Sequence, residues 1–383
     1  MAASTLSVTR TYCAEMGIDQ ERLDRAFGIV ANAVHEGEMQ TAVLAVATGS
    51  EVVRCQAFGA TVVPGAGVES IYMLASISKA ITATAVMTLV DDGLIALSAP
   101  VARYVPEFGA GGKDAVTVWH LLTHTSGLVD EGIPWESWRR DRVTAAQIVQ
   151  SVCATRLEHP PGSRFHYYTG GFFVLAEAIT RLTGMDYPDY FRQRVFDPAG
   201  MADISFNPWQ EGKGQRVIPP VGLTDDGTAT SAEVIRYFAT LNWPGVALFA
   251  TAPDLVNLGQ TLLLDRTAGR SKILSPAAME LMSREQTRGI AKTEGDLVTP
   301  VRYGLTWRKG SIDGRYTLPG SADVIEHDGA TGTWLWIDPA WDLVFVLLTN
   351  QNWAVMDRIQ AKALATVYSA WPHSGPRSNR HAR

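Results

Sequence analysis

A serine and a lysine stand three residues apart in the otherwise uncharged segment MLASISKA, residues 73–80. Ser76 is the only serine of the chain that precedes a lysine at this spacing. On a helix the two side chains lie on one face and can meet. Uncharged surroundings disfavour the ammonium form of Lys79, so the pattern predicts an amine that takes the Ser76 proton and activates a nucleophile. The alternative is a lysine that extends from a core helix next to an ordinary helix-start serine.

Two adjacent tyrosines form a second candidate feature, in the segment PPGSRFHYYTGGF. A turn at Pro161 and Gly162 places Tyr167 and Tyr168 at the start of a predicted helix. A phenol near a cation ionises more easily there and can pass protons. The alternative is a pair of packing residues whose hydroxyls are satisfied.

The third feature is the segment EHDGATGTW, in which His327 precedes two glycines and a predicted strand. The glycines would let the backbone approach a ligand closely and leave a backbone N–H free as an oxyanion donor. The alternative is an ordinary hairpin turn with a surface histidine.

Helices and strands alternate in the first hundred residues. Asp19 is a plausible N-cap for a helix over about 19–35. Residues 41–47 and 51–59 are predicted strands, joined by a small-residue pair suited to a tight hairpin. The helix that carries the serine and lysine is predicted over about 76–93, with glycine as its stop.

The pattern changes after residue 100. Helical stretches alternate with Pro-, Gly- and Trp-rich loops over about 100–281, which indicates a largely helical insertion. Strands are then predicted at 303–310, 333–339 and 342–350, and a last helix at 353–370. Strands near both ends with helices between them predict one sheet assembled from distant segments.

Composition narrows the class of protein. The chain has 383 residues, 46% of them hydrophobic, and a net charge of −6, which indicates a globular core and argues against nucleic acid as a partner. The first residues lack the pattern of a secretory signal, which favours the cytoplasm. Residues 72–90 are too polar to span a membrane, and no membrane partner is expected. Three cysteines cannot all pair, so buried thiols are expected at Cys13, Cys55 and Cys153.

The three features resemble, in the same order along the chain, the active-site motifs of the class C β-lactamase and penicillin-binding-protein-like serine hydrolases. The motifs are SISK at Ser76, the tyrosine at Tyr167 and HDG at His327. Framework segments of that family are also similar, and the resemblance covers roughly residues 19–370. These segments are HLLTHTSGL, PGSRFHYYTGGF, FDPAGMADISF, YGLTW and IDPAWDLVFVLLTN. Ordered agreement over several segments is more specific than any single motif.

The resemblance implies an α+β fold of the β-lactamase/transpeptidase type, an antiparallel sheet flanked by helices with a largely helical inserted subdomain. Residues 1–99 and 282–371 would form the subdomain with the sheet, and residues 100–281 the mainly helical subdomain. Residues 372–383 are expected to be a disordered tail, because they hold too little apolar content to order.

The resemblance also implies an acyl-enzyme mechanism. Ser76 would attack a carbonyl, with proton transfer shared by Lys79 and Tyr167, and the backbone N–H groups of Ser76 and Ala330 would form the oxyanion hole. The family spacing favours Tyr167 over Tyr168 as the catalytic tyrosine. Substrate contacts are expected from His327, Gly329, Thr169, Tyr168 and Trp334.

Two positions depart from the family pattern. Thr169 stands where the tyrosine motif usually carries asparagine, so an amide that could hold a substrate amide is missing. His327 stands where β-lactamases have lysine, so a permanent charge for a substrate carboxylate is replaced by a group that is mostly neutral at pH 7. Both changes weaken the β-lactam interpretation and suit the esterase and acyltransferase branches.

Aromatic residues flank the motifs and favour an apolar, aromatic cleft for an acyl or aryl ester. They are Phe165, Tyr168, Trp334 and Trp336. The alternative is that these rings only pin loops to the core.

Other enzyme classes fail on specific grounds. No GxSxG occurs, so the α/β-hydrolase elbow is absent. His120 and His124 lack the glutamate of a metallohydrolase and are expected to be structural. The segment GAGGKDAV lacks features of both phosphate-binding loops and dinucleotide-binding loops. Neither a metal nor another cofactor is expected.

The leading hypothesis is therefore a serine esterase acting on small or medium acyl esters through an acylated Ser76. An acyltransferase that passes the acyl group to a metabolite alcohol or amine is the close alternative. A β-lactamase, a peptidase or a peptide-releasing cyclase is a weaker one. A silent binding protein of the same fold is the non-enzyme alternative, and the oligomeric state is left open.

Overall fold

The computed structural model describes most of the chain, and the helices and strands below refer to that part. It covers residues 5–7, 10–129, 135–221, 232–267, 272–294, 296–310 and 318–372. The predicted tail at 372–383 lies outside the described residues except for Pro372.

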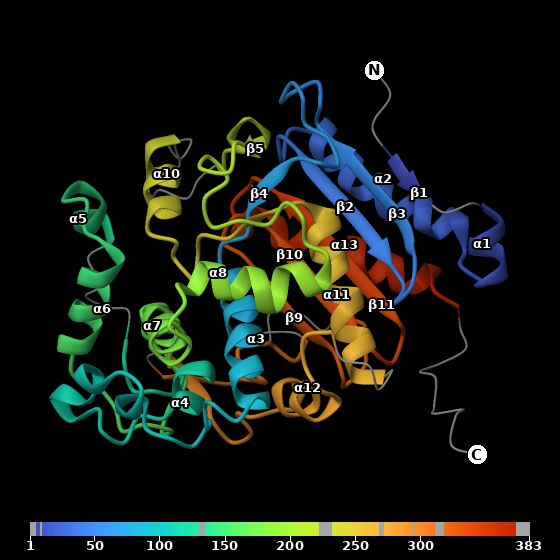
Figure 1. Cartoon of the computed structure of the whole chain (residues 1–383). Coiled ribbons are helices and arrows are strands. Elements are labelled where there is room, and N and C mark those ends of the chain that lie inside the picture. Colours follow the sequence, from blue (N-terminus) through green and yellow to red (C-terminus); the bar gives the residue numbers. More distant parts are fainter. Residues whose placement is uncertain are drawn as a thin grey trace, which may run out of the picture.

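One antiparallel sheet of six strands, in the order β1-β3-β2-β11-β10-β9, forms the centre of the molecule (Figure 1). Its strands are β1 (Thr5–Ser7), β2 (Ala42–Ala47), β3 (Val52–Phe58), β9 (Ile325–Asp328), β10 (Trp334–Asp338) and β11 (Leu343–Thr349). Strand β2, from the start of the chain, pairs with β11 near its end, in a register that places Leu44 opposite Leu347. The predicted sheet from distant segments is thus confirmed.

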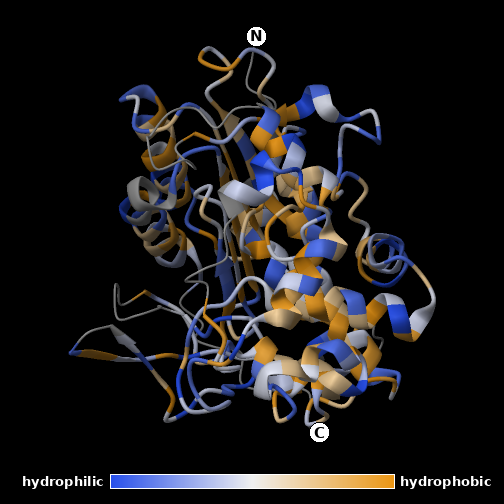
Figure 2. Ribbon diagram, turned by 90° about the vertical axis from the view of Figure 1, so that its left-hand side faces the viewer, coloured by the Kyte–Doolittle hydropathy of each residue, from blue (hydrophilic) through white to orange (hydrophobic). Residues whose placement is uncertain are grey.

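The two faces of the sheet bury different helices. Alternate residues of a strand point to opposite faces, so one strand can serve two cores. In β11, Val344 and Val346 belong to the core that contains helix α3 (Ile77–Asp91), whereas Phe345 and Leu347 belong to the core of α2 (Gln20–His35) and α13 (Trp353–Ala370). Figure 2 shows the strands between helices on both sides.

The middle of the chain is mainly helical, as the sequence predicts. Its helices are α4 (Val118–Leu122), α5 (Trp135–Arg140), α6 (Ala145–Ala154), α7 (Gly171–Thr183), α8 (Tyr187–Phe191), α9 (Asp197–Ala199), α10 (Ala232–Thr240), α11 (Ala252–Thr267) and α12 (Pro276–Ser283). Short strands β4 (Ile71–Met73), β5 (Val217–Ile218) and β6 (Phe249–Ala250) form a second sheet. A hairpin follows, β7 (Ala291–Glu294) and β8 (Leu297–Pro300), and helix α1 (Arg10–Glu15) lies near the start. Among the described residues one buried cluster connects the sheet to this helical region, so the division into subdomains stays a prediction.

Helix α3 is buried along nearly its whole length, from Ile77 to Leu89. Its threonine hydroxyls do not need water, because Thr82 and Thr84 donate to the carbonyls of Ser78 and Ala80 one turn earlier. The helix ends before Gly93, whose φ of +73° is typical of a left-handed helix stop. No helix among the described residues is long and apolar enough to cross a membrane.

The predicted strand at 303–310 is wrong. This segment makes only isolated bridges, between Tyr303 and Arg308 and between Arg308 and Glu326 of β9. Thr306 has a φ of +68°, which turns the chain and interrupts an extended run. The segment therefore lies along the free edge of β9 without continuing the sheet, and it brings Arg308 to that edge.

A buried hydrogen-bond chain fixes the C-terminal helix to β10. The Tyr368 hydroxyl donates to Asp338 over 2.6 Å and accepts from the Trp336 indole N–H over 2.8 Å. Burial raises the pKa of Tyr368 well above its ordinary value, so this hydroxyl keeps its proton. We expect Tyr368→Phe to lower the free energy of unfolding by about 1–3 kcal/mol, because two buried polar groups lose a partner. Urea unfolding measures the change, with Tyr104→Phe, which loses an exposed hydrogen bond, as the matched control; equal effects would contradict the prediction.

Candidate active site

The side chains of Ser76 and Lys79 meet at the start of α3, as the sequence predicts. Lys79 Nζ lies 3.2 Å from Ser76 Oγ and donates to the Gly245 carbonyl over 2.9 Å. Only 1% of the lysine surface is exposed, whereas Ser76 is half-buried within an otherwise buried run. The amine is therefore held between the serine hydroxyl and one backbone oxygen.

The backbone before Ser76 is constrained. Ala75 has a φ of +47°, a left-handed conformation that costs free energy for a residue with a Cβ. Ser76 itself, with φ −71° and ψ −12°, is the N-cap residue, but its side chain accepts no hydrogen bond from the first turn of the helix. The hydroxyl thus stays available at the helix N-terminus.

Thr169 lies next to the carbonyl that holds Lys79. A Cβ built at Gly245 would stand 3.4 Å from Thr169 Cγ2 and 3.5 Å from Lys79 Cγ. Gly245 follows α10 by five residues, and its small size lets the lysine and α7 pack against the same backbone. The predicted substrate contact Thr169 is accordingly placed beside the lysine stem.

Tyr167 joins the site through its ring and its hydroxyl. Lys79 Nζ lies 4.8 Å from the ring centroid, and the ring stacks on His124 at 4.4 Å. The hydroxyl is buried and has no hydrogen-bond partner of standard geometry among the described residues. Burial raises the pKa of Tyr167 well above its ordinary value, although the positive charge of Arg308 and the nearby Ser76 hydroxyl oppose part of this shift. The resting side chain is a phenol.

Tyr168 points elsewhere, into the helical core. Its ring packs against Gly170, since a Cβ added there would come within 2.7 Å of the Tyr168 hydroxyl oxygen. Its backbone N–H donates to His124 Nδ1 over 3.1 Å. Of the two adjacent tyrosines, the structure brings Tyr167 to the lysine and uses Tyr168 for packing.

His327 is buried, so the alternative of a surface histidine is wrong. Its Nδ1 lies 2.7 Å from the Asp328 carbonyl oxygen, which can only accept, so the ring proton sits on Nδ1. Burial and the positive charge of Arg308 lower the pKa of His327 well below 6.5, and the ring is neutral. Its Nε2 is a buried acceptor without a partner among the described residues.

The loop after β9 is fastened to the residues that precede Ser76. Thr331 donates to the Met73 carbonyl over 2.7 Å, and Thr333 donates to the Leu74 carbonyl over 3.1 Å. At Gly329 a Cβ would come within 2.3 Å of the Leu74 oxygen, so only glycine allows this approach. Ala330 follows directly and is half-buried, as Ser76 is.

Trp334 does not join this group, and its expected contact with substrate stays an untested prediction. In the sheet register its neighbour Leu335 pairs with His327 and shares that face, so Trp334 points to the opposite face. There its indole N–H donates to Glu326 over 2.8 Å, and its ring packs against Phe345. Trp336 lies on the same far face. Phe165 packs against His124, and the expected aromatic cleft stays a prediction.

Two neighbours of this group were not predicted to lie at the site. His124 supports the Tyr167 ring, and its own conformation is unusual, with a φ of +57°. Arg308 is buried and pairs with Asp328 over 2.6 Å. Burial alone would lower the pKa of Arg308, but Asp328 together with Tyr303, Glu326 and Tyr167 outweighs this effect and raises the pKa. The framework segment THTSG was the available signal for His124. No motif marked Arg308, which reaches the site from a segment that pairs with β9 only through an isolated bridge.

No group of three or more metal-ligating side chains occurs in the described part of the chain. His120 and His124 do not act as a pair, because each is used locally. His120 closes a capping box with Thr117 at the start of α4, and His124 Nδ1 accepts from the Tyr168 amide.

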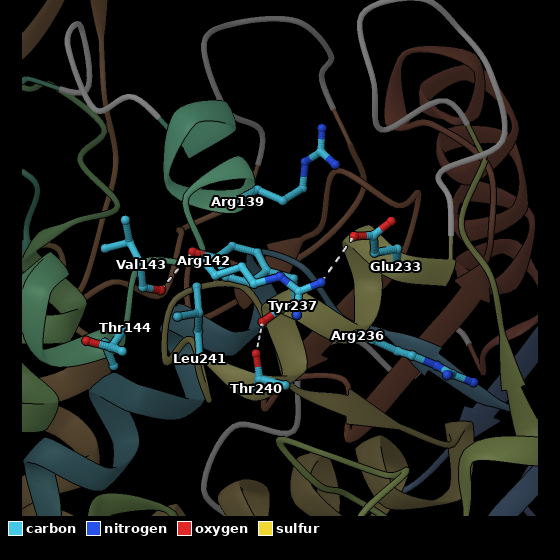
Figure 3. Close-up of a pocket in the computed structure, with 10 residues that line it drawn as sticks. Arg139, Arg142, Val143, Thr144, Glu233, Arg236, Tyr237, Thr240 and Leu241 are labelled. Carbon is cyan, nitrogen blue, oxygen red and sulfur yellow. Dashed lines mark hydrogen bonds and ion pairs between the residues drawn. The ribbon is translucent and has the colours of Figure 1, made fainter.

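A separate pocket of about 500 Å³ lies between α10 and the segment of α5 and α6 (Figure 3). It is lined by three arginines, Arg139, Arg142 and Arg236, and by Glu233, which lies 3.9 Å from Arg142. None of the residues gathered around Ser76 lines this pocket. The reactive constellation and this hollow are therefore distinct features.

Comparisons with known proteins agree with the geometry. Residues 27–368 match the Beta-lactamase family. The chain is 29% identical over 291 residues to penicillin-binding protein 4 of Amycolatopsis lactamdurans, covering 74% of this chain and 72% of that protein. It is 26% identical over 320 residues to esterase EstB of Burkholderia gladioli, covering 74% and 78%. The solved structure of EstCE1, a hydrolase with promiscuous acyltransferase activity, shares the fold with a TM-score of 0.76 at 21% identity, over 91% of this chain and 99% of that one.

The close approach at Gly329 generates the first site prediction. We expect Gly329→Ala to displace the loop, because its Cβ would also come within 2.4 Å of the Thr333 hydroxyl oxygen. Covalent labelling of Ser76 by a fluorophosphonate should slow by about tenfold or more. The matched control is Gly28→Ala, where the added Cβ meets nothing within 4 Å. Equal labelling rates for the two variants would contradict the prediction.

The buried histidines generate a pH prediction. Burial lowers the pKa of both His124 and His327 well below 6.5, so the unfolded chain binds more protons than the folded one as pH falls. Stability from this source is present above pH 6.5 and is lost below it, by about 1.4 kcal/mol per histidine between pH 7.5 and 5.5. We expect His327→Asn to reduce this pH-dependent loss by that amount in urea unfolding. His35→Asn, at an exposed position, is the control; an unchanged pH dependence in His327→Asn would overturn the prediction.

Proposed function

Since this chain belongs to the beta-lactamase family and is an enzyme of the serine hydrolase type, we propose that it is an esterase that hydrolyses small or medium acyl esters through an acyl-enzyme on Ser76. The observation that carries the proposal is the position of Lys79 Nζ, 3.2 Å from Ser76 Oγ and over the Tyr167 ring at 4.8 Å. A nucleophile, a base and a phenolic proton source are thereby within reach of one carbonyl carbon.

The proposed acylation step uses Ser76 as the nucleophile. Its oxygen attacks the ester carbonyl while its proton passes to Lys79. The oxyanion is held by the backbone N–H groups of Ser76 and Ala330, which are supported by the ties between the β9 loop and the residues before α3. These two amides donate none of the backbone hydrogen bonds found in the described part of the chain.

The intermediate then collapses and the ester C–O bond breaks. The leaving alkoxide takes a proton from the Tyr167–Lys79 pair, and the acyl group remains on Ser76. A water molecule attacks the acyl carbon, with the same pair as base, and releases the acid. Burial keeps Tyr167 protonated at rest, which suits a group that gives its proton to a leaving oxygen.

Uncharged groups at the expected substrate contacts favour esters over β-lactams. His327 is a neutral acceptor, and Thr169 offers a methyl group and a hydroxyl beside the lysine stem in place of an amide. The relatives named an esterase and a hydrolase with promiscuous acyltransferase activity are consistent with this preference.

An acyltransferase is the second candidate, and the printed activity of EstCE1 favours it. The acyl-enzyme on Ser76 would be the same, but an alcohol or amine of a metabolite would replace water. β-Lactam, peptide and cyclisation chemistry stay weaker proposals because of Thr169 and His327. A silent binding protein is opposed by the assembled group of Ser76, Lys79 and Tyr167.

Labelling with a fluorophosphonate tests the proposed nucleophile. We expect one adduct, located by mass spectrometry on the peptide that contains Ser76, and none in Ser76→Ala. Short p-nitrophenyl esters, a chromogenic cephalosporin, and an ester with added alcohol then separate the three reactions. An unlabelled Ser76 would sink the enzymatic role assigned to it.

Substitution of the two proton-transfer groups tests the mechanism. We expect Lys79→Ala and Tyr167→Phe each to lower kcat on a p-nitrophenyl ester by about 10²–10⁴-fold, since general acid–base catalysis is lost. Tyr168→Phe is the matched control, because that ring packs in the core, and its kcat should stay within a few-fold of the wild type. A Tyr167→Phe variant with near-normal kcat would exclude the phenol from proton transfer.

A further inference from the structure

A buried ion pair stands beside the proposed active site, at the free edge of β9. The Arg308 guanidinium lies 2.6 Å from Asp328 Oδ1, and its Nε donates to the Tyr303 hydroxyl over 3.1 Å. Tyr303 in turn packs against His124, the ring that supports Tyr167. The arginine therefore reaches from the sheet edge toward the proton-transfer groups.

Arg308 is a fixed positive charge for this region. Its charge lowers the pKa of His327 and of His124 and opposes the raised pKa of Tyr167, so it acts on all three rings. Backbone hydrogen bonds of 3.0 Å in both directions between Arg308 and Glu326 hold it along β9. A guanidinium in such a position is suited to bind a carboxylate through two parallel hydrogen bonds.

That binding capacity is already used by the protein itself. Asp328 supplies an internal carboxylate, and it is the more accessible partner, with 23% of its side chain exposed against 8% for Arg308. The second terminal nitrogen, Nη1, is buried and has no partner among the described residues. The charge of Arg308 is thus neutralised by Asp328, but its Nη1 keeps hydrogen-bond donors that have no partner among the described residues.

Asp328 is also close to the proposed site in space, since its Oδ1 lies 4.0 Å from His327 Nδ1. It directly precedes Gly329, where an added Cβ would meet Leu74 and Ala75, and it stands two residues before Ala330. A substrate carboxylate that approached Arg308 from this side would meet the negative charge of Asp328 first. Like charges brought together in a desolvated place repel strongly.

We propose that Asp328 determines the charge preference of this enzyme, because its carboxylate occupies Arg308 and excludes substrates that carry a carboxylate next to the scissile ester. The inference rests on the proposed esterase function and narrows its substrate class to esters uncharged near the acyl carbon. Removal of the Asp328 charge leaves the guanidinium without a counter-charge, so the same place would attract a substrate carboxylate in place of repelling it.

The test compares two esters of equal chain length, p-nitrophenyl pentanoate and mono-p-nitrophenyl glutarate. In the wild type we expect kcat/KM to favour the neutral ester by about tenfold or more. In Asp328→Asn, which keeps the shape and removes the charge, this ratio should fall by about tenfold or more, mainly through a lower KM for the glutarate ester. The double variant Asp328→Asn with Arg308→Gln should lose that gain.

A matched control removes another acid that is paired with an arginine. Asp323 is exposed and lies 3.2 Å from Arg266, so Asp323→Asn changes the net charge equally and should leave the ester ratio unchanged. The wild-type ratio alone is informative if Asp328→Asn does not fold: equal kcat/KM for the two esters would overturn the proposal. An unchanged ratio in folded Asp328→Asn would do the same. Failure of the proposed function is a different result, since neither ester would then be hydrolysed.

Discussion

The site depends on one close approach of two backbones, the end of β9 against the residues that precede α3. Gly329 stands where any Cβ would collide with the Leu74 carbonyl oxygen, and the hydroxyls of Thr331 and Thr333 fasten the same segments together. These contacts join a strand from the end of the chain to a helix from its beginning. The position of His327 and the Ala330 amide relative to Ser76 is fixed by this contact.

Burial of charge is the second constraint, and the protein meets it differently for each group. Lys79 gives one N–H to the Gly245 carbonyl and faces the Tyr167 ring. Arg308 has a carboxylate partner in Asp328. The two histidines lose their charge instead, because burial and the positive charge of Arg308 both disfavour protonation. Arg308 is thus the cationic side chain that pairs with the Asp328 carboxylate.

Much of this site could be predicted because its parts are local. The approach of Ser76 to Lys79 follows from helix spacing, and the choice of Tyr167 followed from family spacing after the PG turn. The choice between two adjacent tyrosines is made in space by Gly170 and Gly171, whose missing side chains leave room for the Tyr168 ring in the core. The helix ends at Asp19 and Gly93 were also readable, since capping is a local interaction.

What could not be predicted depends on pairing between distant segments. Strand β9 carries Glu326, His327 and Asp328, a sequence too polar to suggest a buried strand, although Glu326 is satisfied by the Trp334 indole. Without β9 the register of β10 was unknown, and a shift of one residue reverses which side chains face the site. The sequence therefore could not show that Trp334 lies on the face opposite to His327. Arg308 was missed because Thr306 interrupts its predicted strand.

The neutral state of the histidines bears on how the proposed mechanism divides acid from base. His327 offers only a lone pair on Nε2, so it can accept a hydrogen bond from a phenol or a substrate hydroxyl but cannot give a proton. Tyr167, kept protonated by burial, is then the neutral donor within this group. Lys79 is the group that contacts the Ser76 hydroxyl directly, which leaves it as the base for the first step. The different environments of these side chains, more than their ordinary acidities, assign the roles.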